Sequence, residues 1–122
     1  MRILLSIKPE YANLIFSGMK KYEFRRTVFK KTKVTSVVVY ASAPVQKVIG
    51  EFEIEEVLSD SPDVLWAKTE QHAGVRKEFF FEYFSDKKIA HAIKIKKTRL
   101  YKKPLDIQEA FNTTPPQSFI YL

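Results

Sequence analysis

The sequence predicts an α+β fold, a small and mostly antiparallel β-barrel with peripheral helices. Five or six segments have strand character, and two helical insertions interrupt them. This order fits neither a helical bundle nor a doubly wound sheet. The chain has 122 residues, of which 45% are hydrophobic and 14% aromatic. That length and composition predict one globular domain, residues 1–122, with a sizeable core.

The first half of the chain is expected to contain one helix and four strands. Arg2–Ile7 reads as a strand, and Pro9 suits the first turn of a helix because its missing N–H would have no partner there. Gly18 ends that helix near Ser17, since glycine adopts a left-handed conformation without steric cost. Alternation and β-branched residues predict further strands at Tyr22–Arg25, Thr35–Ser42 and Lys47–Leu58, with the basic loop Thr27–Lys33 after the first of these.

The second half begins with two predicted helices. Pro62 opens the first, which ends by Gly74, and the second starts near Val75. The second helix carries an aromatic stripe, which we interpret as core rather than as a surface for stacking bases: Phe79, Phe80, Tyr83 and Phe84. A long strand, a short helix or turn and a final strand are expected at Lys88–Leu100, Pro104–Phe111 and Phe119–Leu122.

Charge is unevenly distributed along the sequence. The formal net charge is +7, and basic residues concentrate in Met19–Lys33 and Lys87–Lys103, whereas Glu51–Glu82 is acidic. This segregation predicts one positive and one negative face, and a positive face favours a polyanion such as nucleic acid. The residues predicted for the nucleic-acid face are Lys21, Arg26, Lys94 and Lys96.

The segment Gly18–Arg26 is the strongest candidate for a site. It holds four cations and one carboxylate directly after a predicted helix end. Strand alternation places Tyr22 and Phe24 on one face and Glu23 and Arg25 on the other. We expect Lys20, Glu23 and Arg25 to project toward a common region.

Several motifs of this chain resemble one family. Gly18-x-Lys20-x-x-Glu23-x-Arg25 resembles the G-x-K-x-x-E-x-R signature of the ASCH domain, a member of the PUA-like superfamily. The surrounding family pattern is matched, in order, by Ser6-Ile7-Lys8-Pro9, Tyr40-Ala41-Ser42-x-Pro44, Val48-Ile49-Gly50-x-Phe52, Phe80-x-x-Tyr83-Phe84 and Pro115-Pro116-Gln117-Ser118-Phe119. The resemblance therefore covers nearly the whole chain.

The resemblance implies a PUA-like barrel with a cleft beside the signature and a role in RNA binding, often linked to translation or its regulation. Some relatives are enzymes, including an amidohydrolase branch acting on acylated cytidine and another branch associated with ribonuclease activity. In the amidohydrolase branch a threonine occupies the position of Glu23, so its hydroxyl chemistry is not carried over to this chain. The family pattern alone also makes Tyr40 and Ser118 candidates for the cleft.

Each residue of the motif has more than one possible role. Lys20 suits a phosphate ligand or, when desolvated, a general base with a lowered pKa. Glu23 can accept hydrogen bonds from an exocyclic amine or a ribose, or neutralise Arg25, whose planar fork suits a phosphate or a base edge. The structural alternative is an ion pair of Glu23 with Arg25 or Lys20 that only holds the strand in place. Lys20 and Glu23 are the candidates for catalysis.

We expect a protein that binds RNA or a nucleotide in a cleft lined by Lys20, Glu23 and Arg25, without turnover. One alternative is a small hydrolase acting on RNA or on a modified nucleoside. Another is an interaction module whose basic face meets an acidic protein. With no cysteine, no H-E-x-x-H motif and no glycine-rich phosphate loop, the sequence predicts neither a metal site nor a cofactor. The N-terminal apolar stretch is too short for a signal peptide, and no segment is long enough to span a membrane, so we expect a cytoplasmic protein.

Overall fold

The structure, a computed structural model, describes residues 1–122 as six strands, four α-helices and one 3₁₀ helix. None of the helices is long and apolar enough to cross a membrane. In chain order the elements are β1 (Arg2–Ile7), α1 (Pro9–Phe16), β2 (Tyr22–Arg25), β3 (Ser36–Ala41), β4 (Lys47–Asp60), α2 (Pro62–Thr69), η1 (Glu70–His72), α3 (Lys77–Tyr83), β5 (Ala90–Leu105), α4 (Ile107–Phe111) and β6 (Phe119–Tyr121).

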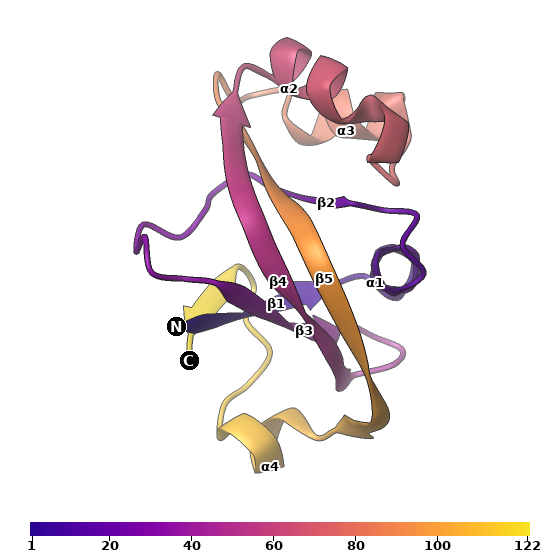
Figure 1. The fold of residues 1–122 in the computed structure, drawn as a ribbon, viewed down its shortest axis with the longest axis vertical. Coiled ribbons are helices and arrows are strands. Elements are labelled where there is room, and N and C mark those ends of the chain that lie inside the picture. Colours follow the sequence, from indigo (N-terminus) through magenta and orange to yellow (C-terminus); the bar gives the residue numbers. More distant parts are fainter.

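All six strands belong to one sheet, in the order β2-β5-β4-β3-β1-β6. β1 and β3 are parallel, and every other neighbouring pair is antiparallel. The long strands β4 and β5 run side by side through the molecule, with α2 and α3 covering one end and α4 lying at the other (Figure 1). The predicted α+β class with a mostly antiparallel sheet is therefore confirmed.

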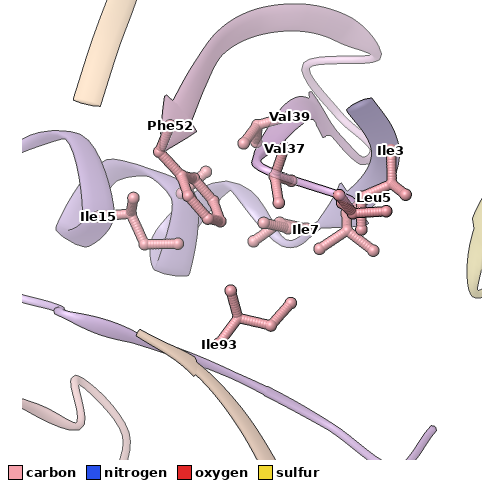
Figure 2. Close-up of a cluster of buried hydrophobic side chains, with 10 residues drawn as sticks. Ile3, Leu5, Ile7, Ile15, Val37, Val39, Phe52 and Ile93 are labelled. Atoms are coloured by element: carbon pink, nitrogen blue, oxygen red, sulfur yellow. The ribbon is translucent and has the colours of Figure 1, made fainter. Parts of the chain in front are cut away.

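The sheet curls into a half-barrel, so that strands far apart in its order face each other. Ile93 of β5 and Ile7 of β1 belong to one cluster of ten buried residues, although β4 and β3 separate their strands in the sheet. Figure 2 shows these two side chains pointing toward one another, with Ile15 of α1 and Phe52 of β4 beside them. This apolar interior is the barrel core that the sequence predicts.

A second core cluster joins α2 and α3 to the sheet. Phe80 and Phe84 of α3 are each only 1% exposed, and the Phe24 ring of β2 packs edge-on against Phe80 with centroids 5.0 Å apart. Phe79, in contrast, is 37% exposed. The prediction of a single buried aromatic stripe is confirmed for Phe80 and Phe84 but wrong for Phe79. The pairs 79/83 and 80/84 each share a helix face at i, i+4 spacing, and these faces point in different directions.

Several element boundaries differ from those expected, and β5 shows the largest shift. β5 runs from Ala90 to Leu105 instead of from Lys88 to Leu100, and α3 begins at Lys77 instead of Val75. The extension of β5 follows from its partner, because Val48 of β4 pairs with Leu105. Pairing with β4 therefore keeps the end of β5 in a strand, although the apolar pattern of that segment does not predict one.

Along β4 and β5 the acidic and basic segments do not form two separate faces, which corrects the charge prediction for this part of the surface. β4 carries many of the acids and pairs antiparallel with the basic strand β5. As a result Lys94 Nζ lies 2.8 Å from Glu55 Oε2, and Arg99 Nε lies 3.3 Å from Glu51 Oε1. Charges segregated along the sequence are therefore interleaved in space over this part of the surface.

Candidate functional site

The turn between α1 and β2 directs Lys20 into the molecule. Gly18 adopts φ +87°, which confirms the expected left-handed helix end. The Lys20 backbone N–H then donates to the Leu14 carbonyl, and the Lys21 N–H donates to the His72 carbonyl. The chain is thus anchored on both α1 and the segment before α3 at the point where the signature begins.

Lys20 is buried, with only 2% of its surface exposed. Its ammonium donates to the Ala73 carbonyl oxygen at 2.6 Å and lies 4.8 Å from the centre of the Phe24 ring. Gly74 makes room for its stem, since a Cβ on that glycine would lie only 2.5 Å from Lys20 Cγ. Burial lowers the pKa of Lys20 to about 8, and the nearby Glu23 carboxylate partly opposes this shift.

Glu23 is 6% exposed and pairs with Arg25, whose Nη1 lies 3.2 Å from Glu23 Oε2. Burial raises the pKa of the Glu23 carboxyl, while the positive charges of Arg25 and Lys20 act in the opposite direction. The other oxygen, Oε1, has no hydrogen bond to the protein, and the chain contains no fully buried polar side-chain atom without a partner. Oε1 is therefore open to the space in front of it.

Arg25 closes the seam of the half-barrel, by which we mean the line where the two edges of the curled sheet meet. Its Nη2 donates to the Ser118 carbonyl at 3.0 Å, and its Nη1 donates to the Ser6 carbonyl at 3.4 Å. These bonds join β2, at one edge of the sheet, to β1 and to the loop before β6, at the other. The ion pair proposed as a structural alternative is present, and much of the Arg25 fork is occupied by the protein itself.

These side chains face a cavity of about 180 Å³. Its lining comes from the end of β1 and the start of α1 with the residue between them, from the signature, and from α3 with the loop before it: Ser6, Ile7, Lys8, Tyr11, Lys20, Glu23, Phe24, Arg25, Val75, Phe79 and Tyr83. When all three are ionised, Lys20, Glu23 and Arg25 carry a net positive charge. The arrangement can hold an electron-rich group against apolar walls and exchange protons with it.

Four aromatic residues of the cavity were not predicted as part of a site. Phe79 and Tyr83 had been interpreted as core, Phe24 was expected on the strand face opposite Glu23, and Tyr11 was not singled out as a site residue. The available signal was the spacing on α3, where two i, i+4 aromatic pairs cannot occupy one narrow face. Only the packing of α3 on β2 decides which pair is buried.

The remaining candidates lie elsewhere or have other partners. Tyr40 does not line the cavity, since it is buried in a separate cluster with Leu4 and Val48. Ser118 lies at the seam through its carbonyl, with its hydroxyl 3.4 Å from that of Thr27. A direct role of Tyr40 or Ser118 in binding a ligand stays a prediction.

Of the residues predicted for a nucleic-acid face, two have acidic partners. Arg26 forms a two-bond pair with Asp86, which lowers the pKa of that carboxyl to about 2, and Lys94 pairs with Glu55. Lys21 and Lys96 are exposed. No group of three or more His, Cys, Asp or Glu side chains is placed to hold a metal ion.

Comparison with known proteins gives a consistent result. The ASCH domain family profile matches residues 5–99. The chain is 28% identical over 123 residues to an ASCH domain-containing ribonuclease of Zymomonas mobilis, covering 98% of this chain and 82% of that protein. The crystal structure of ASCH from Zymomonas mobilis superimposes with a TM-score of 0.91 at 28% identity, covering 99% of this chain and 87% of that one.

A further relative is a longer protein. The chain is 33% identical over 124 residues to large ribosomal subunit protein uL22 of Ureaplasma parvum serovar 3. The alignment covers 98% of this chain, which spans only 39% of the length of that relative.

Proposed function

Because this chain belongs to the ASCH domain family, we propose that it is a ribonuclease that holds and cleaves RNA in the cavity of Lys20, Glu23 and Arg25. The observation that carries the proposal is that two buried ionisable groups, Lys20 and Glu23, line the same cavity, and burial shifts the pKa of each toward neutrality. Perturbed acids and bases that face a cavity are typical of catalytic sites. The similarity to an ASCH domain-containing ribonuclease supports catalysis over the binding without turnover that the sequence analysis preferred.

The two groups suit the two proton transfers of RNA cleavage, Glu23 as the base and Lys20 as the acid. Glu23 Oε1 takes the proton of a ribose 2′-hydroxyl, and the 2′ oxygen then forms a bond to phosphorus. The bond from phosphorus to the 5′ oxygen breaks, and that oxygen receives a proton from the Lys20 ammonium. The products are a 2′,3′-cyclic phosphate and a 5′-hydroxyl end, and water returns both groups to their starting protonation states. General acid and base groups of this kind accelerate reactions by about 10²–10⁴ each.

Arg25 has a supporting role in this proposal. Its bonds to the Ser6 and Ser118 carbonyls keep its guanidinium beside Glu23. The positive charge favours the ionised carboxylate that proton abstraction requires. Arg25 therefore positions and ionises Glu23.

The test is cleavage of RNA by the pure protein and by a Lys20→Arg variant. Arginine keeps the positive charge but does not release a proton near neutral pH. We expect cleavage to fall by about 10²–10⁴, while RNA affinity changes only a few-fold. Lys21→Arg, at an exposed neighbour, is the matched control and should cleave normally. If the Lys20→Arg variant cleaves at the wild-type rate, Lys20 contributes only its positive charge. If the wild type yields no products, the function is RNA binding without cleavage.

A further inference from the structure

The cavity has an aromatic wall that the proposed chemistry does not use. Phe79 and Tyr83 line it from α3, one turn apart, with ring centroids 5.8 Å apart and planes only 11° from parallel. Tyr11 of α1 stands next to them, its centroid 5.8 Å from that of Phe79. Core packing does not account for the position of Phe79, because that residue is 37% exposed while Phe80 and Phe84 fill the core.

We propose that Phe79 and Tyr83 form a stacking platform for one unpaired nucleobase of the RNA. This inference rests on the proposed function and names the part of the cavity that would hold a base of the RNA. Phe79 and Tyr83 already form a stack of two nearly parallel rings. Every nucleobase has a π-face, so an unpaired base can extend such a stack at an outer ring face. A base held within a duplex cannot reach the wall without leaving its stack.

The size of the cavity supports one base rather than a longer segment. At about 180 Å³ it is smaller than the 300–1,000 Å³ typical of pockets for drug-sized ligands. A single ring system placed against α3 would lie beside Lys20 and Glu23, which face the same space. The platform therefore brings the sugar and phosphate attached to that base close to the two ionisable groups.

The surroundings indicate where the phosphate backbone runs. A neighbouring groove of about 780 Å³ shares Tyr11, Val75 and Phe79 with the cavity. Its lining also includes Glu10, Glu78 and Glu82, with Arg76 as the one cation. These carboxylates repel phosphates, whereas Lys8 and Arg25 line the cavity itself. The RNA backbone therefore enters beside Lys8, and the base points toward α3.

The experiment measures the affinity of the chain for a short single-stranded RNA and for an abasic strand of the same length and charge. Phe79→Leu keeps an apolar side chain but removes the π-face. We expect it to weaken binding of the base-bearing strand by about fivefold or more, with no change for the abasic strand. Phe79→Tyr should restore wild-type binding. Phe81→Leu is the matched control, because Phe81 is on the same helix but does not line the cavity, and it should leave both affinities unchanged.

Each alternative outcome is distinct. An equal loss for both strands, or no loss for either, overturns the platform while RNA binding and cleavage by the wild type keep the proposed function intact. Wild-type protein that neither binds nor cleaves any RNA overturns both. Thermal unfolding of each variant shows whether it is folded, and a folded Tyr83→Leu repeats the comparison at the second ring.

Discussion

The lysine of the cavity and the lysines of β5 carry the same charge but have opposite surroundings. Lys20 is 2% exposed, with its ammonium on a carbonyl oxygen and an aromatic ring. Lys94 is partly exposed and pairs with Glu55, which raises its pKa instead of lowering it. The difference shows that the number of basic residues says little about chemistry. Removal from water lowers the pKa of a cation toward neutrality, whereas an acidic partner raises it.

The pH dependence of cleavage tests this difference most strongly. Glu23 must be ionised, so the rate should rise with pH as the carboxyl passes its raised pKa. Lys20 must be protonated, so the rate should fall above about pH 8, by about tenfold per pH unit. A rate measured between acid and alkaline pH should therefore give a bell-shaped profile. A rate that is flat through pH 8 to 10 would mean that Lys20 gives up no proton.

Truncation of Phe84, which packs against the Phe24 wall of the cavity, should have the largest effect on the free energy of unfolding. Phe84 is 1% exposed and packs edge-on against Phe24, whose ring lies over Lys20. Phe84→Ala should lower the free energy of unfolding by about 3–5 kcal/mol, as for other buried phenylalanines. Leu100→Ala, at a 60% exposed position of β5, should change it by less than about 0.5 kcal/mol. Chemical denaturation of both variants measures the difference, and similar losses would show that the two regions are equally packed.

Two glycines with positive φ offer a finer comparison. At Gly74 (φ +67°) an added Cβ would lie 2.5–2.8 Å from the Lys20 stem, whereas at Gly18 (φ +87°) nothing lies within 4 Å. Both alanine variants carry backbone strain of about 1–2 kcal/mol, but Gly74→Ala adds overpacking of about 1–3 kcal/mol. We also expect only Gly74→Ala to reduce cleavage, because it displaces Lys20. Equal unfolding free energies and equal cleavage rates for the two variants would show that the Lys20 stem can move aside without consequence.

The smallest effect is expected from the surface pair of β4 and β5. Lys94→Ala removes an exposed ion pair with Glu55, and such pairs contribute little to stability. The midpoint of thermal unfolding and the cleavage rate should both stay close to those of the wild type. A large loss of RNA affinity in Lys94→Ala would instead restore β5 as a nucleic-acid face in spite of its acidic partners.

Local features of the fold, and the meeting of the three charged residues of the signature at one cavity, could be predicted from the sequence. Gly18 ends α1 because of its own conformational freedom, and β2 begins where the alternating pattern begins. Lys20, Glu23 and Arg25 are brought together as predicted, since they lie within one turn and one short strand. These features depend on neighbours along the chain, and for that reason a sequence pattern is enough to predict them.

The roles within the site depend on distant segments, and only the tertiary structure decides them. The carbonyl that holds Lys20 belongs to Ala73, and the carbonyls that hold Arg25 belong to Ser6 and Ser118. Phe79 differs from Phe80 only in which helix face meets β2, and Tyr40 was assigned to the cleft although it packs in another cluster. The pairing of β4 with β5 likewise interleaves acidic and basic residues that are separate along the sequence. Burial, pKa and pairing are properties of the space around a group, and that space is assembled from residues far away in the chain.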